Sequence, residues 1–308
     1  MPGFLRAERD VDAIEGSQRH VQLEPNDYEN RTLEGKLEPM NVVAVLGAGK
    51  IGEALMSGLL HGGHQASELL FTEKHADRAA ELTERYGVEA VSVSEAARRA
   101  DVLVVAVKPQ DIEPVLDELA SSLGSKTLIV SLCAGLPTAL YERRLAAGVP
   151  VVRVMPNTPM VVGEAMSALS AGRHATPEHL AVVEQLMASV GKVIELPESQ
   201  QDAVTALSGS GPAYFFYLVE AMIDAGILLG LPRAVAEKLI VQSAVGASKM
   251  LAESGEHPVT LREAVTSPAG TTINAIRELE KHGVRAALIA AIEAARDRSV
   301  ELGKAHEG

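Results

Sequence analysis

The chain has 308 residues, a length typical of two domains. Its formal net charge of −13 argues against nucleic acid as a partner, because an acidic surface repels phosphate backbones. Hydrophobic residues make up 47% of the chain and aromatic residues only 3%, which predicts a folded, aliphatic core. The single cysteine, Cys133, excludes an intrachain disulfide and a cysteine-based zinc site, and we expect a soluble, cytoplasmic protein.

Residues 1–39 differ from the rest of the chain. Acidic residues outnumber basic ones there and the apolar residues follow no period, so we expect a flexible N-terminal extension without a targeting signal. The most apolar window, 213–231, contains Glu220 and Asp224, which are costly inside a bilayer. We therefore interpret it as a buried helix in a core or at a subunit interface, and we expect no membrane partner.

Short apolar runs alternate with helical patterns after residue 40. The runs are 42–46, 69–72, 102–107, 128–132 and 151–155, and the first two helical patterns are 50–62 and 76–86. Apolar runs of this length suit strands buried on both faces. The alternation predicts an α/β fold whose parallel sheet is covered by helices on both sides.

The strand patterns end at about Glu195 and helical patterns follow. These predict helices over 199–207, 212–229, 232–253, 271–281 and 284–304. We expect a Rossmann-type NAD(P)-binding domain at 40–198, followed by an all-helical dimerisation and substrate domain at 199–308. A helix that is apolar on all sides must be buried, so the helix at 213–231 predicts a second subunit as its cover.

A glycine-rich turn directly follows the first predicted strand. Its residues are Gly47, Ala48, Gly49, Lys50, Ile51 and Gly52, which fit G-x-G-x-x-G. In a dinucleotide-binding fold the first glycine permits the tight turn, the second lets the backbone approach a pyrophosphate, and the third allows close helix packing. The pattern predicts a dinucleotide site, with a turn of merely small residues as the alternative.

Charged residues follow the second strand, where such folds discriminate between cofactors. Glu73 favours NADH through the ribose hydroxyls, whereas Lys74 and Arg78 favour NADPH through its 2′-phosphate, so NADPH or NADH remains open. A solvated charge cluster is the alternative. Two more strand ends should line the same crevice with Ala106, Val107, Lys108, Pro109, Cys133, Ala134 and Gly135. We favour Cys133 as a small buried residue without a redox role.

A hydroxyl-rich loop, 266–272, leads into the predicted helix at 271–281. It fits an N-capping loop. Unpaired N–H groups of Gly270, Thr271 and Thr272 would equally suit a carboxylate at the positive end of the helix dipole. For the small residues of 208–214 we favour close packing over ligand contact. The histidine spacings do not indicate a metal site.

From Met40 onward the chain resembles the pyrroline-5-carboxylate reductase family. The matching segments occur in the family's order and spacing, and they are 47–52, 106–109, 155–159, 202–214 and 266–272. The last two are specific to the family. The resemblance implies reduction of 1-pyrroline-5-carboxylate to L-proline by NAD(P)H, the final step of proline biosynthesis. It also implies an obligate homodimer, with further assembly into a decamer of five dimers.

The resemblance further implies a substrate site in the helical half. Thr272 would be the catalytic residue, because its hydroxyl could hydrogen-bond the imine nitrogen. The implied substrate contacts are Glu198, Val265, Ser267, Gly270, Thr271 and Thr272. A charged residue at an exposed helix start is the alternative for Glu198. Ala269 stands where the family usually has glycine, and a positive φ there would cost alanine about 1 kcal/mol.

Two other functions remain open on the sequence. A related two-domain reductase of the β-hydroxyacid dehydrogenase type would need a catalytic lysine, and the hydroxyl-rich loop contains none. A non-catalytic NAD(P)-binding sensor would bind the cofactor without turnover.

Overall fold

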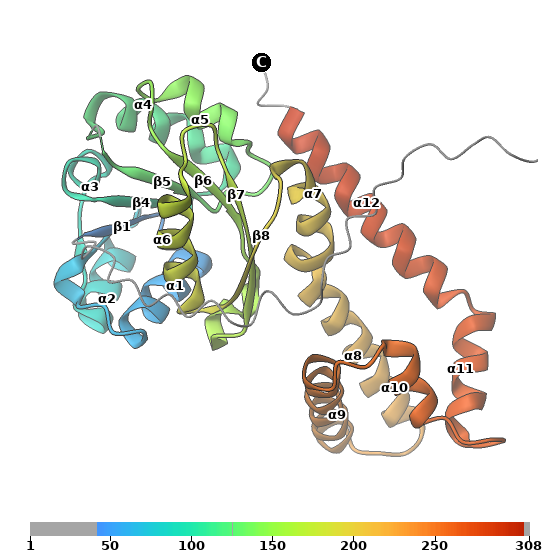
Figure 1. Ribbon diagram of the computed structural model, residues 1–308. Helices are drawn as coiled ribbons and strands as arrows, with labels where there is room; N and C mark the ends of the chain where they lie inside the picture. Colours follow the sequence, from blue (N-terminus) through green and yellow to red (C-terminus); the bar gives the residue numbers. More distant parts are fainter. Residues whose placement is uncertain (1–41, 125, 305–308) are drawn as a thin grey trace, which may run out of the picture. The chain divides into compact units, whose positions relative to one another are not determined.

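The computed structural model describes residues 42–124 and 126–304, so the flexible extension expected at 1–39 lies outside the described residues. The described part begins as an α/β fold built on one mixed sheet and continues as helices (Figure 1). The expected fold class, an α/β half followed by a helical half, is confirmed.

The eight-stranded sheet of the described residues has the order β3-β2-β1-β4-β5-β6-β7-β8. The strands are β1 (Val43–Leu46), β2 (Leu69–Thr72), β3 (Glu89–Ala90), β4 (Val102–Val105), β5 (Leu128–Ser131), β6 (Val151–Met155), β7 (Ala165–Ala171) and β8 (Gly191–Glu195). Strands β1 to β6 are parallel, but β7 runs antiparallel to β6. The five strands expected from the sequence are thus parallel as predicted, whereas β7, which the sequence did not predict, is antiparallel because a short connection returns the chain beside β6 without a helical crossover.

Both faces of the sheet are buried, as expected for a doubly covered sheet. Alternate residues of β1 belong to two separate clusters, with Val43 and Val45 in one and Ala44 and Leu46 in the other. Helices α1, α2 and α6 cover the first face, and α3, α4 and α5 cover the second. The helices are α1 (Lys50–His61), α2 (Ala76–Tyr86), α3 (Val93–Arg99), α4 (Ile112–Ser122), α5 (Thr138–Arg144) and α6 (Pro177–Ala188).

The strand order reverses at β1, which pairs with β2 on one side and β4 on the other. In open α/β sheets ligands bind at such a reversal, outside the carboxyl ends of the strands. The loops after β1, β2 and β4 therefore define where a dinucleotide should lie.

The helical half begins with α7 and a π-helical turn. Its elements are α7 (Gln201–Val204), η5 (Thr205–Gly209), α8 (Gly211–Leu228), α9 (Arg233–Glu253), α10 (Pro258–Ala264), α11 (Thr271–Lys281) and α12 (Val284–Lys304). Helices α11 and α12 have the predicted bounds, whereas α10 was not expected. Helix α8 packs on α9, and α12 packs on α7 and η5, where Ser299 donates to Asp202 over 2.6 Å.

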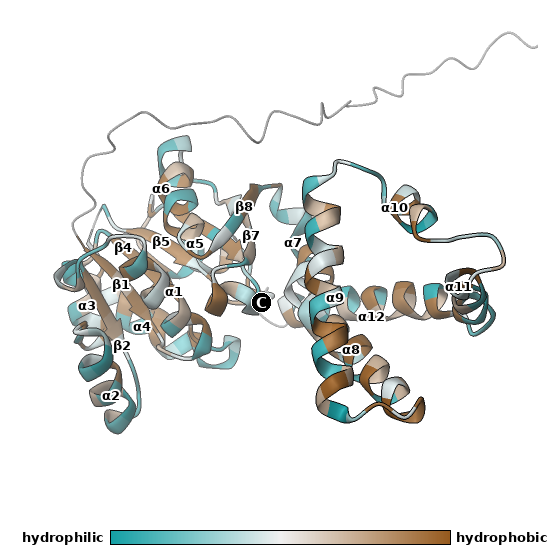
Figure 2. Cartoon of the chain, turned by 90° about the horizontal axis from the view of Figure 1, so that it is seen from below, coloured by the Kyte–Doolittle hydropathy of each residue, from teal (hydrophilic) through white to brown (hydrophobic). Residues whose placement is uncertain are grey.

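Helix α8 is hydrophobic along its length and exposed in the single chain (Figure 2). Phe215, Phe216 and Tyr217 are 62%, 69% and 72% exposed. By length and composition alone, the continuous helical stretch Glu198–Leu228 would be long and apolar enough to cross a membrane. Since the chain itself does not bury this surface, the expected cover must come from another molecule.

Candidate active site

The glycine-rich loop leaves β1 and is anchored to the end of β2. Gly47 adopts a positive φ of 98°, which glycine tolerates, and its N–H donates to Thr72 O over 3.2 Å. A Cβ at Gly52 would overlap Gly47 O, so only glycine lets α1 pack this closely. A Cβ at Gly49 would meet no protein atom within 4 Å. The backbone at Gly49 is therefore open, as a closely approaching pyrophosphate would require.

The strand ends after β4 and β5 lie beside this loop. A Cβ at Gly47 would come within 3.1 Å of Ala106 O, and Cys133 Sγ donates to Val107 O over 3.2 Å. Cys133 is buried, and desolvation raises the pKa of its thiol. This burial agrees with the expectation that Cys133 is a small buried residue. The structure thus brings the three predicted cofactor segments, 47–52, 106–109 and 133–135, together at one edge of the sheet.

The charged residues after β2 already have partners. Glu73 Oε1 accepts from the His75 N–H over 3.0 Å, and Lys74 Nζ lies 2.9 Å from Asp111 Oδ1. Arg78 pairs with Glu53 and Glu81. These contacts place Glu73 and Lys74 at the loop next to the glycine-rich loop, and they commit Arg78 to the interface between α1 and α2.

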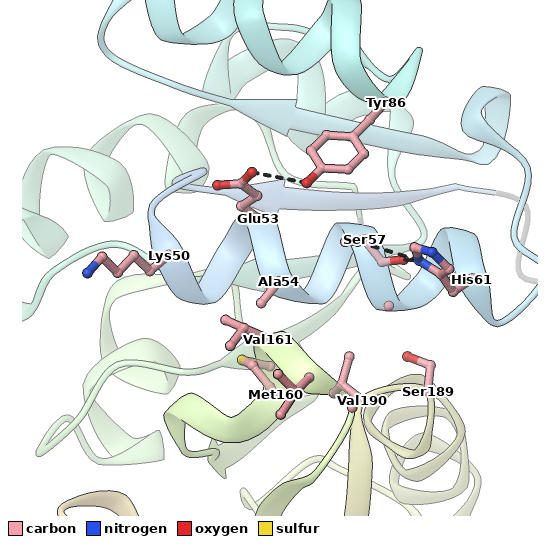
Figure 3. A pocket seen from close by; sticks show the side chains of 13 residues that line it. Lys50, Glu53, Ala54, Ser57, His61, Tyr86, Met160, Val161, Ser189 and Val190 are labelled. Atoms are coloured by element: carbon pink, nitrogen blue, oxygen red, sulfur yellow. Dashed lines mark hydrogen bonds between the residues drawn. The ribbon is translucent and has the colours of Figure 1, made fainter. Parts of the chain in front are cut away.

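A cavity of about 560 Å³ runs along α1 (Figure 3). One wall is the face of α1 that begins at Lys50, and the other includes Met160 and Val161 of the short helical turn η3 (Thr158–Val162). Tyr86 donates to Glu53 Oε1 over 3.0 Å at its rim. No residue of the hydroxyl-rich loop lines this cavity, so it is separate from the expected substrate contacts.

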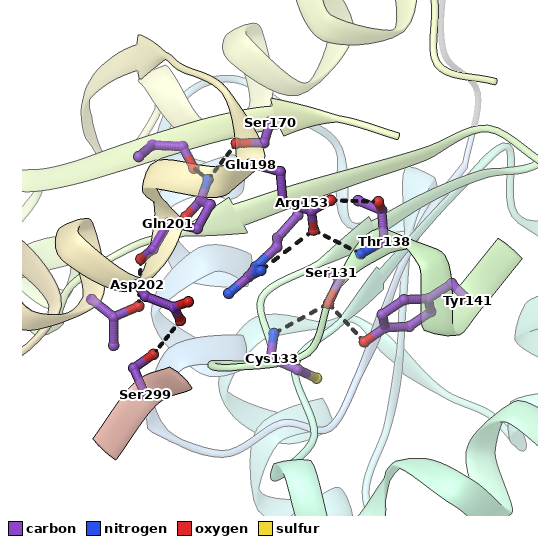
Figure 4. A network of polar contacts seen from close by, with 12 residues as sticks. Ser131, Cys133, Thr138, Tyr141, Arg153, Ser170, Glu198, Gln201, Asp202 and Ser299 are labelled. Carbon is purple, nitrogen blue, oxygen red and sulfur yellow. Dashed lines mark hydrogen bonds and ion pairs between the residues drawn. The ribbon is translucent and has the colours of Figure 1, made fainter. Parts of the chain in front are cut away.

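Glu198 lies just before the helical half and contacts α5 and β6 of the α/β half (Figure 4). Its carboxylate accepts from the N–H and the hydroxyl of Thr138, both over 2.7 Å, and lies 3.3 Å from Arg153 Nη1. Arg153 is buried within β6. Glu198 does begin a short helical turn, η4 (Glu198–Gln200), and its side chain is 28% exposed, but both of its carboxylate oxygens are bound within the chain, so it is not a free surface charge.

Sequence reasoning missed Arg153 and Thr138. A signal was present, since Arg153 is the charged residue within the apolar run 151–155 and a buried arginine needs a carboxylate partner. Nothing in the local sequence marks Thr138 as that carboxylate's second partner, because it lies 60 residues away from Glu198.

The small-residue segment 208–214 is used for packing. Asn157 Nδ2 donates to Ser208 O over 3.3 Å, and a Cβ at Gly209 would come 2.6 Å from Met155 Cε. The Tyr214 hydroxyl donates to Ala206 O over 3.0 Å. The favoured interpretation, close approach of another part of the chain, agrees with these contacts.

The hydroxyl-rich loop is not an N-capping loop. Helix α11 begins after Gly270, and no side chain caps it. The Gly270 N–H donates to Ser267 O over 3.1 Å, so the expectation of an unpaired N–H at Gly270 is wrong. The hydroxyls of Ser267, Thr271 and Thr272 form no hydrogen bond with another described residue. These hydroxyls are left available for a ligand.

Ala269 adopts a φ of 56°, the single positive value among non-glycine residues in 42–124 and 126–304. The strain expected for alanine at this position is therefore present. Val265, just before the loop, is 60% exposed. The loop is an open, slightly strained turn that presents hydroxyls and one apolar side chain.

The hydroxyl-rich loop does not reach the glycine-rich loop of its own chain. Gly135 packs against α12 at Ser299 and Leu302, near the end of that helix. Helix α12 begins at Val284, which lies roughly 22 Å from Ser299 along the helix axis, because an α-helix rises about 1.5 Å per residue. Both views show α11 at the end of α12 away from the sheet (Figures 1 and 2). The cofactor edge and the loop at α11 are thus separated within one chain.

A sheet with an open glycine-rich loop, followed by helices with an exposed apolar face, defines a two-domain dinucleotide-dependent oxidoreductase. Residues 198–302 match the family described as pyrroline-5-carboxylate reductase dimerisation, and residues 42–135 match NADP oxidoreductase coenzyme F420-dependent. The chain belongs to the pyrroline-5-carboxylate reductase family. A relative of that name from Corynebacterium melassecola is 48% identical over 269 residues, which cover 86% of this chain and 100% of the relative.

Other similar proteins agree. The pyrroline-5-carboxylate reductase of Arabidopsis thaliana is 41% identical, over 85% of this chain and 95% of its own. The structure of a reductase of this family from Coxiella burnetii has a TM-score of 0.80 at 36% identity, covering 85% of this chain and 98% of the other. The structure of pyrroline carboxylate reductase from Plasmodium falciparum, with NADP bound, has a TM-score of 0.78 at 30% identity, covering 85% of this chain and 98% of the other. The exposed helix α8 lies within the matched dimerisation segment, so the apolar surface that the single chain leaves open belongs to the part of the chain that dimerises in this family.

Proposed function

We propose that this chain reduces 1-pyrroline-5-carboxylate to L-proline with NADPH or NADH, as the last step of proline biosynthesis. In this proposal residues 40–198 hold the cofactor and residues 199–308 dimerise and hold the substrate. The observation that carries it is the start of α11, where the hydroxyls of Ser267, Thr271 and Thr272 form no hydrogen bond with another described residue. A small ring acid matches these hydroxyls, because a hydroxyl can donate to its carboxylate and can accept from its protonated imine nitrogen.

The cofactor residues fit a dinucleotide, because the Gly49 backbone is open and α1 begins there with no side chain capping it. NAD(P)H supplies the hydride when bound. We assign its binding to Gly47, Ala48, Gly49, Lys50, Ile51, Gly52, Glu73, Lys74, Ala106, Val107, Lys108, Pro109, Cys133, Ala134 and Gly135. Cys133 contributes as a spacer that holds the strand ends after β4 and β5 together through Val107 O.

The substrate residues act by position. The backbone N–H groups of Thr271 and Thr272 and the hydroxyl of Ser267 bind the carboxylate at the positive end of the α11 dipole. Gly270 keeps the turn open, because a Cβ there would overlap Ser267 Oγ. Val265 covers the apolar part of the ring. The Thr272 hydroxyl holds the imine nitrogen, and since a protonated imine is already electrophilic, no strong acid is needed.

The complete site forms between two subunits. The separation of the glycine-rich loop from α11 within one chain supports this arrangement, as does the exposed apolar face of α8. Further assembly into a decamer of five dimers is supported by the family resemblance and by Leu228 and Leu229 at the end of α8, which are 88% and 84% exposed. The lone buried cysteine suits the reducing cytoplasm.

The deciding experiment follows NADPH absorbance after 1-pyrroline-5-carboxylate is added to the purified full chain. We expect oxidation of NADPH with formation of L-proline. Binding of NADPH without turnover would support the sensor and contradict the proposal. Turnover with β-hydroxyacids but not with the cyclic imine would contradict it as well, in favour of the other reductase class. Light scattering on the same sample measures whether the assembly has two or ten subunits.

A further inference from the structure

An ion pair bridges the two loops that flank the glycine-rich loop. Lys74 lies in the turn after β2, and Asp111 ends the short turn η2 (Pro109–Asp111) after β4. Their charged atoms are 2.9 Å apart. Because β1 lies between β2 and β4, the pair spans two strand spacings, about 9.6 Å, at the carboxyl edge of the sheet. It joins the loops between which the adenosine end of a dinucleotide should bind.

Lys74 differs from the other charged residues after β2. Arg78 is held by two carboxylates, Glu53 and Glu81, and its hydrogen bond to Glu81 raises the pKa of Arg78. Glu73 is held by the backbone of His75. Lys74 has one carboxylate partner on a different loop, and its side chain is 69% exposed. Of the candidates for 2′-phosphate recognition, Lys74 is thus the cation that can change partner at the smallest cost.

We propose that Lys74 binds the 2′-phosphate of NADPH and that Asp111 competes with that phosphate for Lys74. The exchange of partners would then set the preference for NADPH over NADH. NADH has no 2′-phosphate, so Lys74 stays paired with Asp111 when it binds. The inference rests on the proposed function, and it makes Asp111 a residue that determines specificity without having to touch the cofactor.

Electrostatics gives the sign of the effect. A phosphate is a stronger partner for an ammonium group than one carboxylate is, because it carries more charge and more acceptor oxygens. The Asp111 carboxylate is 39% exposed, and it would lie close enough to repel a phosphate bound at Lys74. Removing its charge should therefore strengthen 2′-phosphate binding, whereas removing the charge of Lys74 should weaken it.

The experiment uses two nucleotide probes on the full-length dimer, adenosine 2′,5′-bisphosphate and 5′-AMP, with calorimetric titration. For Asp111→Asn we expect the bisphosphate to bind about three- to fivefold tighter, the range of an exposed ion pair. For Lys74→Met we expect it to bind about tenfold weaker. Binding of 5′-AMP should change less than about twofold in both. The ratio of kcat/KM for NADPH to that for NADH should move in the same directions.

Asp117→Asn is the matched control, because it removes the same charge from α4, where Asp117 pairs with Arg144. It should leave both nucleotides unchanged. Equal effects of Asp111→Asn on the two nucleotides, or a Lys74→Met variant that keeps its bisphosphate affinity, would overturn the inference. Failure of the proposed function can be told apart from failure of this inference. A wild-type chain that does not reduce the imine can still be titrated with the two nucleotides.

Discussion

Thr138 donates two hydrogen bonds to Glu198, one from its backbone N–H and one from its hydroxyl, each 2.7 Å long. Thr138 begins α5, directly after the loop that contains Cys133 and Gly135. Glu198, which lies just before the helical half, is thereby tied to the loop at the predicted cofactor edge. Arg153, 6% exposed, completes the arrangement as the charge partner of Glu198.

Replacing Glu198 with glutamine should therefore weaken cofactor binding. The amide cannot neutralise the buried Arg153, and its NH2 group would face a donor at Thr138, so we also expect a loss of about 1–3 kcal/mol of stability. NADPH fluorescence titration and thermal unfolding measure the two effects. Glu195→Gln, at an exposed position of β8, is the control. A raised KM for the imine with unchanged NADPH affinity would instead make Glu198 a substrate contact.

Substitutions at Gly49 and Gly52 should have different effects. A Cβ at Gly49 would meet no protein atom within 4 Å, so Gly49→Val should fold normally but lose at least about tenfold in NADPH affinity, the value of charge-assisted hydrogen bonds to phosphate. A Cβ at Gly52 would overlap Gly47 O, so Gly52→Ala should lose about 1–3 kcal/mol of stability. Thermal unfolding with and without NADPH distinguishes the loss of cofactor affinity in Gly49→Val from the loss of stability in Gly52→Ala. Retained affinity in Gly49→Val would disprove the pyrophosphate assignment.

Thr272→Ala should lower kcat/KM for the imine by about ten- to a hundredfold, because a hydrogen bond to a charged group is lost. NADPH affinity should remain, since Thr272 lies on the other loop. Thr272→Ser keeps the hydroxyl and is expected to recover most of the activity. Steady-state kinetics with saturating NADPH tests this, and unchanged kinetics for the alanine variant would remove Thr272 from the reaction.

Cys133 should resist alkylation in the folded protein. Burial raises the pKa of this thiol, so the neutral form persists to a higher pH than in a free cysteine, and the thiolate is the reactive form. We expect mass spectrometry to find almost no iodoacetamide adduct at about pH 8 and complete labelling after unfolding. Labelling of the native enzyme should increase only as the pH rises toward the raised pKa. Fast native labelling at neutral pH would contradict this account of Cys133.

Ala269→Gly should raise the melting temperature. The positive φ of Ala269 costs alanine about 1–2 kcal/mol, and glycine adopts this φ without that steric cost. Glycine makes the unfolded chain more flexible, but the entropic cost of ordering it is smaller than the strain that is removed. Ala275→Gly, inside α11, should instead destabilise by about 1 kcal/mol. Both are compared with the parent protein at one protein concentration, because dimerisation contributes to the measured stability. Equal destabilisation by the two substitutions would show that the turn at Ala269 is unstrained.

The local sequence pattern was enough to predict those elements that have a clear apolar run or a clear helical periodicity. The apolar run before Gly47 identified β1 and the glycine-rich loop, and the helical periodicity of 271–281 identified α11. The pattern failed for β7 and β8. Strand β7 is built from small residues with buried hydroxyls at Ser167 and Ser170, and β8 is mostly exposed, so neither has a continuous apolar run.

The sequence by itself determined the fold class, the family and the two loops that we propose bind the cofactor and the substrate, because each depends on residues close together in the chain. Only the tertiary structure decided which charges meet. Lys74 pairs with Asp111 across 37 residues, and Glu198 with Thr138 across 60. Such partners are selected when the sheet assembles and brings distant loops to one edge, and no short-range spacing encodes that choice.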